Sequence, residues 1–265
     1  MITFSNGRLY KLVYIDTNII NEISKNTNKL GKNFFLKYVN GEYMFVTSAF
    51  NVYELSKAKG ESKNKIIQIF NNIPLGITCT FPQLIEFEKM HTGFHKDMVM
   101  FATGPKGIFN NQLENIFYIM QNDKSFGEAQ NKMIHNFNSE IACWCKNQRQ
   151  FNWQKDYKMN ILKSMNETFK IYDNYFEIKE LGKYYSLEVL AYIKNQFIFC
   201  SQKDININSV IDAYNSSFLP YVEEYITERT VGSWLEMSKA KLSFLKNKRI
   251  IKLSELYEKG KCNIG

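Results

Sequence analysis

Short apolar runs alternate with amphipathic segments near the start of the chain. Residues 12–15 and 43–46 are uninterrupted apolar or aromatic runs, which suit central parallel strands covered on both faces. Between them, one helical face collects Ile19, Ile20 and Ile23, and residues 63–70 repeat this spacing before a third strand at 75–78. Strands that alternate with helices predict βα units, and therefore a parallel sheet with right-handed crossovers.

The same alternation returns near the other end of the chain. Residues 210–214 begin a helix that ends at residues 219–222, and residues 225–227 form a short strand. Residues 249–256 then look like a last strand followed by a short helix. We therefore expect both ends of the chain to contribute to one α/β unit.

The middle of the chain has a different pattern. Between residues 82 and 203 the apolar positions recur at helical spacing alone, which predicts a large all-helical insertion. We expect this segment to be a subdomain that covers the crevice of a discontinuous α/β domain made of residues 1–81 and 204–265. The positions that carry the helical period are Leu113, Ile116, Phe117, Met120, Met133, Phe137, Ile141, Trp144, Leu162, Met165, Phe169, Tyr172, Leu190, Ile193 and Phe197.

Four acidic residues occupy comparable places in the predicted elements. Asp16 follows the first strand and Glu228 follows the strand at 225–227, while Glu54 and Asp212 lie in helices that begin near the same edge of the sheet. Carboxylates that converge repel one another unless a cation lies among them. Hard divalent cations prefer such oxygen ligands, so the pattern indicates a metal site.

Each acid also has an ordinary structural explanation. Asp16, Glu54 and Asp212 suit the first turns of helices, where the helix dipole favours negative charge, and Glu228 suits a surface ion pair. Glu223 is close enough to Glu228 in sequence to take its place as the fourth acid. The order of the four acids along the predicted sheet favours the metal site over these alternatives.

In these residues the chain resembles the PIN-domain nuclease family, over roughly residues 9–80 and 205–258. The resemblance rests on the apolar strand that runs into Asp16-Thr17-Asn18, the helix start from Ser48 to Glu54, Asp212-Ala213, and Ile226-Thr227-Glu228-Arg229. It implies a small doubly wound, mainly parallel sheet, Mg²⁺ or Mn²⁺, and hydrolysis of RNA phosphodiester bonds. Carried over by position, the metal ligands and catalytic acids are Asp16, Glu54, Asp212 and Glu228, with Asn18 or Thr227 orienting a ligand or a phosphate.

The distribution of charge supports a polyanionic partner. The formal net charge is +8, and eight Lys or Arg residues lie between Lys239 and Lys261 against two Glu. Such a basic rim beside an acidic pocket would gather a phosphate backbone, and Arg229, Lys248 and Arg249 are the substrate-binding candidates. An ordinary solvated basic face explains the same composition.

The predicted insertion offers a second surface for nucleic acid. Arg149, Phe151, Trp153 and Lys155 combine cations with aromatic rings around a predicted connection between helices. Aromatic rings can stack on exposed bases while the cations neutralise phosphates. Aromatic residues at helical spacing are nevertheless more often part of a core.

These features favour a metal-dependent endoribonuclease. The family resemblance implies that such an enzyme acts as a toxin or in phage defence. Two alternatives stay open: a non-catalytic RNA-binding or complex-scaffolding protein that keeps the fold, and a nuclease for structured or single-stranded DNA. An antitoxin or defence-complex partner and a homodimer are both compatible with the sequence. The chain has no apolar run long enough to cross a bilayer and no signal peptide, so we expect a cytoplasmic protein.

Overall fold

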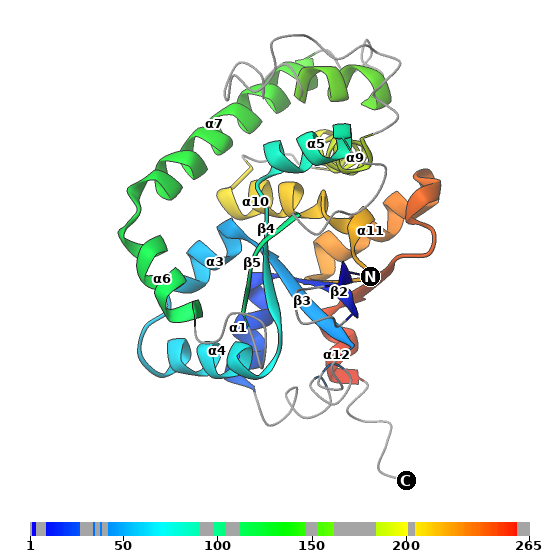
Figure 1. Cartoon of the computed structure of the whole chain (residues 1–265). Coiled ribbons are helices and arrows are strands. Elements are labelled where there is room, and N and C mark those ends of the chain that lie inside the picture. Colours follow the sequence, from blue (N-terminus) through cyan, green and yellow to red (C-terminus); the bar gives the residue numbers. More distant parts are fainter. Residues whose placement is uncertain are drawn as a thin grey trace.

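The computed structural model describes residues 2–3, 9–26, 34, 38, 42–90, 98–103, 112–146, 153–161, 184–200 and 205–258. Within these residues the strands form one sheet in the order β5-β4-β3-β2-β6-β7, and β1 pairs with β2 (Figure 1). The strands are β1 (Ile2–Thr3), β2 (Leu9–Ile15), β3 (Tyr43–Ser48), β4 (Leu75–Thr78), β5 (Val99–Thr103), β6 (Glu224–Thr227) and β7 (Arg249–Lys252).

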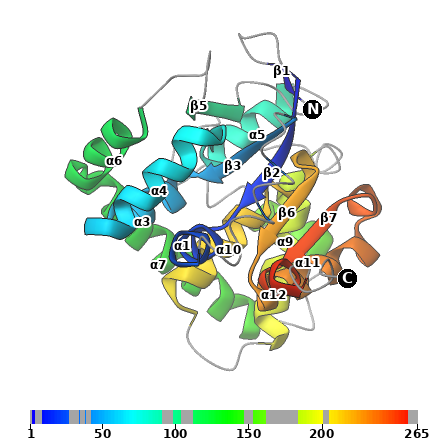
Figure 2. The ribbon, with the colours of Figure 1, turned by 90° about the horizontal axis from the view of Figure 1, so that it is seen from below.

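Helices cover both faces of the sheet (Figures 1 and 2). One face packs against α1 (Thr17–Lys25), α3 (Ala49–Ser56), α4 (Gly60–Asn72), α6 (Gln112–Asn122) and α12 (Leu253–Glu258). The other face packs against α5 (Phe81–Met90), α7 (Lys124–Lys146), α9 (Tyr185–Cys200), α10 (Ile207–Ser216) and α11 (Arg229–Lys241). Short helical turns are η3 (Trp153–Tyr157), η5 (Leu219–Tyr221) and η6 (Ser243–Leu245).

Strand β2 is the centre of the molecule. It pairs in parallel with β3 on one side and with β6 on the other, and the chain proceeds outward in opposite directions from these two neighbours. Side chains of β2 alternate between the two cores: Leu12 and Tyr14 belong to one, and Val13 and Ile15 to the other. This double burial explains the uninterrupted apolar sequence. Because the chain proceeds outward in opposite directions on the two sides of β2, the strand order reverses at the end of this strand.

The α/β class and most of the predicted strands are confirmed. Strands β2, β3, β4, β6 and β7 occur where the hydrophobic pattern indicated them, and they pair with one another in parallel. The expectation that residues 82–203 are entirely helical is wrong, because β5 pairs antiparallel with β4. Its five residues, rich in β-branched and aromatic side chains, cover an edge of β4 that would otherwise be open to solvent.

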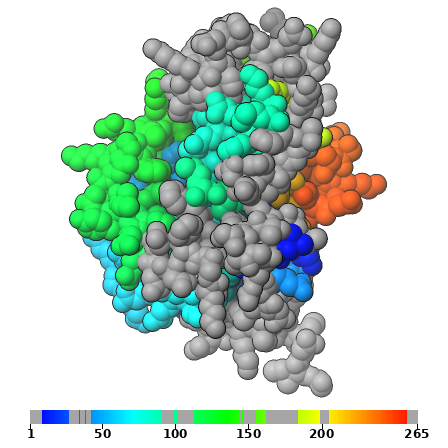
Figure 3. Space-filling model, viewed as in Figure 1, coloured from blue at the N-terminus to red at the C-terminus, as the bar shows by residue number. Residues whose placement is uncertain are grey.

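Helices from this middle segment belong to both cores. Leu113 and Phe117 of α6 pack in the core beside α3, whereas Phe137 of α7 and Leu190 of α9 pack in the core beside α10. The predicted helical positions from Leu162 to Tyr172 lie outside the described residues. Figure 3 shows the surfaces of α6 and α7 on one flank of the molecule and that of α11 on the other. None of the helices described is both long and apolar enough to cross a bilayer.

A buried ion pair joins two of these helices. The side chain of Lys194 on α9 is fully buried, and its Nζ lies 2.5 Å from Oε2 of Glu140 on α7. The same ammonium group lies 4.6 Å from the ring centre of Phe137 and 5.6 Å from that of Tyr214 on α10. Lys194 on α9 therefore contacts two other helices, and Glu140 supplies the negative charge that offsets its desolvation.

Removing Glu140 should destabilise the fold strongly. Glu140→Ala leaves the buried Lys194 ammonium without its counter-charge, so we expect the free energy of unfolding to fall by about 3 kcal/mol. Glu61→Ala is the matched control, since Glu61 and Lys65 form an exposed pair within one helix at 2.8 Å and should contribute little. Urea denaturation of both variants measures the difference, and equal effects would show that burial of the pair is unimportant.

Candidate functional site

Two acidic residues leave adjacent strands at the same edge of the sheet. Asp16 directly follows β2 and Glu228 directly follows β6. Because Ile15 and Ile226 are partners in the parallel pairing of these strands, Asp16 lies beside Thr227, and Glu228 is one residue further along. The backbone N–H of Asp16 also donates to the carbonyl of Ile226 at 3.3 Å, which fixes the register at this edge.

Neither carboxylate caps the helix that it precedes. Asp16 and Glu228 are the N-cap residues of α1 and α11 and have extended backbones, yet neither side chain makes a capping hydrogen bond. Asp16 Oδ2 instead accepts a hydrogen bond from Thr227 Oγ1 at 3.2 Å, and Glu228 Oε1 accepts one from Asn18 Nδ2 at 2.5 Å. Helix capping therefore does not explain these two acids.

The other two acids come from helices on opposite faces of the sheet. Glu54 lies on α3, which begins after β3 and whose N-cap Ser48 accepts from the N–H of Asn51 at 3.2 Å, as the sequence predicts. Asp212 lies in the middle of α10 rather than in its first turn, so the dipole of that helix does not account for it. Both side chains are half-buried.

Electrostatic interactions link all four acids. Burial is the main cause that raises the pKa of Asp16, to about 6, with repulsion from Glu228 and Glu54 adding to it and the Thr227 hydrogen bond opposing it. Burial likewise raises the pKa of Asp212, to about 8, and repulsion from Asp16, Glu228 and Glu54 raises it further. Glu54 and Glu228 are thus close enough to Asp16 and Asp212 to oppose the ionisation of these two aspartates.

The chemistry of this cluster suits a hard divalent cation. Its donors are carboxylate oxygens, and a cation among them would relieve the repulsion that raises the pKa of Asp16 and Asp212. In the described part of the chain, no three His, Cys, Asp or Glu side chains are placed so that together they hold a metal ion. Asp16 and Glu228 are instead each held by a neutral side chain, Thr227 and Asn18.

The structure separates the two candidates for the fourth acid. Glu223 lies just before β6, where its Oε2 accepts from the backbone N–H of Leu12 at 2.6 Å. Its own N–H donates to the carbonyl of Leu12, so Glu223 is attached to the middle of β2 rather than to its end. Glu228, which repels Asp16, is therefore the acid that joins the cluster.

Two of the basic candidates lie at the opposite edge of the sheet from the acids. Lys248 donates to the carbonyl of Val222 at 2.9 Å, and Arg249 forms an ion pair with Glu224 at 3.1 Å, where β6 and β7 begin. Arg229, by contrast, is the exposed first residue of α11 and follows the acid cluster directly. The structure thus brings Arg229, but neither Lys248 nor Arg249, to the acidic edge.

Sequence reasoning missed a basic residue at the acidic edge. Lys252 ends β7 and is the strand partner of Thr227, whose hydroxyl bonds to Asp16. The aliphatic part of Lys252 crosses the first turns of α11 at Gly232, where an added Cβ would lie 2.9 Å from its Cγ. A lysine at the carboxyl end of a predicted parallel strand was the signal that could have identified it.

Further candidates have no established place in the acidic site. Arg149 and Phe151 lie outside the described residues, as does the side chain of Trp153, and Lys155 is exposed in η3.

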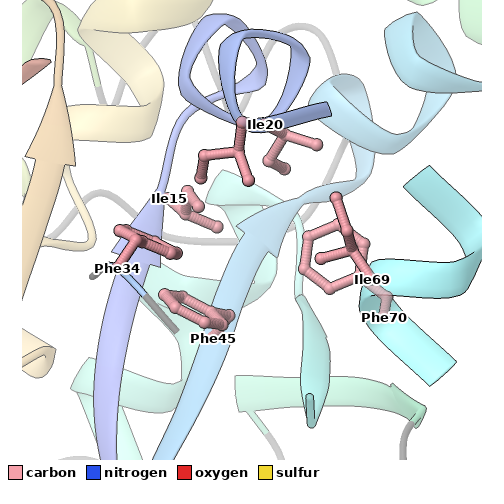
Figure 4. Close-up of a pocket in the computed structure, with 7 residues that line it drawn as sticks. Ile15, Ile20, Phe34, Phe45, Ile69 and Phe70 are labelled. Carbon is pink, nitrogen blue, oxygen red and sulfur yellow. The ribbon is translucent and has the colours of Figure 1, made fainter. Parts of the chain in front are cut away.

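An apolar crevice between α1, α4 and the sheet, shown in Figure 4, is lined by Ile15, Ile20, Ile23, Phe34, Phe45, Ile69 and Phe70. With no polar group in its lining, this crevice does not suit a charged ligand.

Comparison of this chain with protein-family models, with curated proteins and with solved structures found no match. The case for a function therefore depends on the geometry and electrostatics of the acidic edge.

The pKa of Asp212 predicts how stability changes with pH in metal-free buffer. Because the folded-state pKa is raised above the ordinary value of an aspartate, ionisation opposes folding, and stability falls as the pH rises from about 4 to about 8. Asp212→Asn removes this effect. We expect the variant to exceed the wild type in free energy of unfolding at pH 8.5 by at least ~1.4 kcal/mol, the equivalent of one pKa unit.

Urea denaturation with EDTA between pH 5 and pH 9 tests this expectation. Asp123→Asn is the control, because the pKa of Asp123 is instead lowered, by hydrogen bonds from the side chain and backbone of Ser125. The difference between wild type and Asp212→Asn should grow with pH, whereas the control should not gain stability. Parallel curves for wild type and Asp212→Asn would contradict the repulsion inferred here.

Proposed function

We propose that the chain is a metal-dependent phosphodiesterase that hydrolyses RNA, with Asp16, Glu54, Asp212 and Glu228 as its metal ligands. The observation that supports this proposal is that the neighbouring acids raise the pKa of the buried Asp16 and of Asp212, near the edge where the strand order of the sheet reverses. Their mutual repulsion opposes folding. Acids whose pKa is strongly raised by burial and by neighbouring charges are characteristic of functional sites.

Mg²⁺ or Mn²⁺, when bound, would neutralise these carboxylates, lower the pKa of a water molecule and offset negative charge on the phosphate. Thr227 would orient Asp16, and Asn18 would orient Glu228, through the hydrogen bonds already described. Asp16 and Asp212, the two acids with raised pKa, are the direct ligands in this proposal. Glu54 and Glu228 would bind the metal through water molecules or orient the attacking water.

Cations beside the acids support an anionic substrate. Arg229 follows Glu228 and Lys252 is the strand partner of Thr227, and together with the net charge of +8 they favour attraction of a phosphate backbone to the acidic edge. The earlier resemblance to PIN-domain nucleases agrees with this combination and is the reason for proposing RNA over DNA. A setting in toxin or phage-defence systems is part of the same proposal.

Loss of the acids should abolish metal-dependent cleavage. With labelled total RNA and Mn²⁺, we expect cleavage by the wild type, and a decrease of at least about 100-fold for Asp16→Asn and Asp212→Asn, because each loses a charged metal ligand. Asp123→Asn should cleave normally. Urea denaturation in EDTA establishes that the variants are folded, and sequencing of the new RNA ends identifies the site of cleavage.

The same assay distinguishes the alternative functions. A protein that retains RNA without cutting it, and does so equally after Asp16→Asn, would be an RNA-binding or scaffolding protein. Cleavage of flapped or branched DNA in Mg²⁺, with RNA left intact, would identify a structure-specific DNA nuclease. Either outcome would contradict the proposed ribonuclease activity.

The position of Lys252 predicts a role in binding the substrate backbone. Lys252→Gln removes one phosphate contact, so we expect weaker RNA binding and a slope of log affinity against log salt concentration that is smaller by about 1. Lys246→Gln is the matched control, since Lys246 is exposed in the turn before β7, at the opposite edge of the sheet. Filter binding at several salt concentrations measures both slopes. Equal slopes for the two variants would remove Lys252 from the binding surface.

A further inference from the structure

A layer of buried polar side chains lies where α3, α10 and the sheet meet. Asn51 on α3 is at its centre and is 1% exposed. Its Oδ1 accepts from Nδ2 of Asn215 on α10 at 3.0 Å, and its own Nδ2 donates to Thr47 Oγ1 at 3.0 Å and to the hydroxyl of Tyr14 at 3.2 Å. Asn51 therefore connects β2, β3, α3 and α10 through side chains alone.

The two asparagines occupy matching positions relative to the acids. Asn51 precedes Glu54 by three residues on α3, and Asn215 follows Asp212 by three residues on α10. Residues at this spacing are neighbours on a helix surface. The hydrogen bond between Asn51 and Asn215 consequently joins the two helices one turn away from the acids that they carry.

The polar layer also reaches the strands that carry the remaining acids. Tyr14, which accepts from Asn51, lies on β2 two residues before Asp16. Its ring stacks on that of Tyr225 on β6, with 4.5 Å between centres and 7° between planes. Tyr225 in turn lies three residues before Glu228. Every element that supplies an acid to the cluster is thus connected to this layer.

Packing alone does not account for an amide pair at this place. A buried amide loses its hydrogen bonds to water, and a hydrogen bond to another amide replaces them only in one relative orientation of the two helices. Apolar side chains would fill the same space in several orientations. A directional bond between α3 and α10 therefore specifies their separation. We propose that Asn51 and Asn215 form a positioning pair that sets the distance between Glu54 and Asp212 and so determines the affinity of the acidic site for its metal.

This inference rests on the proposed function, and Mn²⁺ binding tests both. Isothermal titration calorimetry gives the dissociation constant for wild type, Asn51→Ala, Asn215→Ala and the double variant. We expect about tenfold weaker binding for each single variant, as is typical when partners of metal ligands are lost. The double variant should bind little more weakly than either single variant, because both changes break the same bond.

Asn206→Ala is the matched control for a general loss of stability. Asn206 caps α10 by accepting from the N–H of Ser209 at 2.9 Å, so its loss weakens the same helix without breaking the positioning pair. We expect its Mn²⁺ affinity to stay within about twofold of wild type. Equal losses of affinity for Asn206→Ala and Asn215→Ala would overturn the inference.

A second variant keeps the test decisive if the alanine variants unfold. The double change Asn51→Leu and Asn215→Leu replaces the pair by apolar side chains of similar size, which preserves packing while removing the directional bond. Its Mn²⁺ affinity should fall at least as far as that of Asn215→Ala. Wild-type affinity in this variant would overturn the positioning role alone, whereas a wild type that binds no Mn²⁺ would overturn the proposed function and this inference with it.

Discussion

The repulsion among four carboxylates at one edge of the sheet is the constraint on which the rest of the structure depends. Asp16 is buried and Asp212 is half-buried, and each has acidic neighbours that oppose its ionisation. A flexible backbone would relieve such repulsion by moving the acids apart. The elements that carry them must therefore be anchored by interactions away from the edge.

Two structural arrangements provide this anchoring. Strand β2 is buried on both faces and paired on both sides, so the position of Asp16 is fixed by the centre of the fold. Asp16 and Glu228 also stand at the N-termini of α1 and α11, where the partial positive charge of the helix ends offsets part of the repulsion. Neither helix is capped by these side chains, which leaves the carboxylates available to a ligand.

Local patterns in the sequence predicted the elements that support the acids. The apolar run before Asp16 requires a doubly covered strand, and Ser48 is recognisable as a helix cap, so β2 and the start of α3 could be located without coordinates. Strand β5 could not, because four apolar residues and a threonine between helical segments are too short a run to show a periodicity of their own. Its pairing with β4 decides its conformation.

Which residues share an edge depends on strand direction rather than on composition. Counting charges favoured Lys248 and Arg249, yet these begin β7, and only Lys252 at its other end is the partner of Thr227. The bond between Asn51 and Asn215 spans 164 residues of sequence, and nothing local to either residue indicates it. Long-range pairs of this kind explain why the supporting layer of the candidate site was not foreseen.

The pairing of β2 with β6 also has a consequence for biosynthesis. Thr227 follows Asp16 by 211 residues, so the ribosome must complete all of that intervening chain before the two strands can meet. Until then β2 lacks one of its neighbours, and closing so long a loop makes this a slow, late step of folding. A nascent polypeptide therefore has no acidic cluster, and whatever reactivity the cluster confers arises only after most of the chain has been translated.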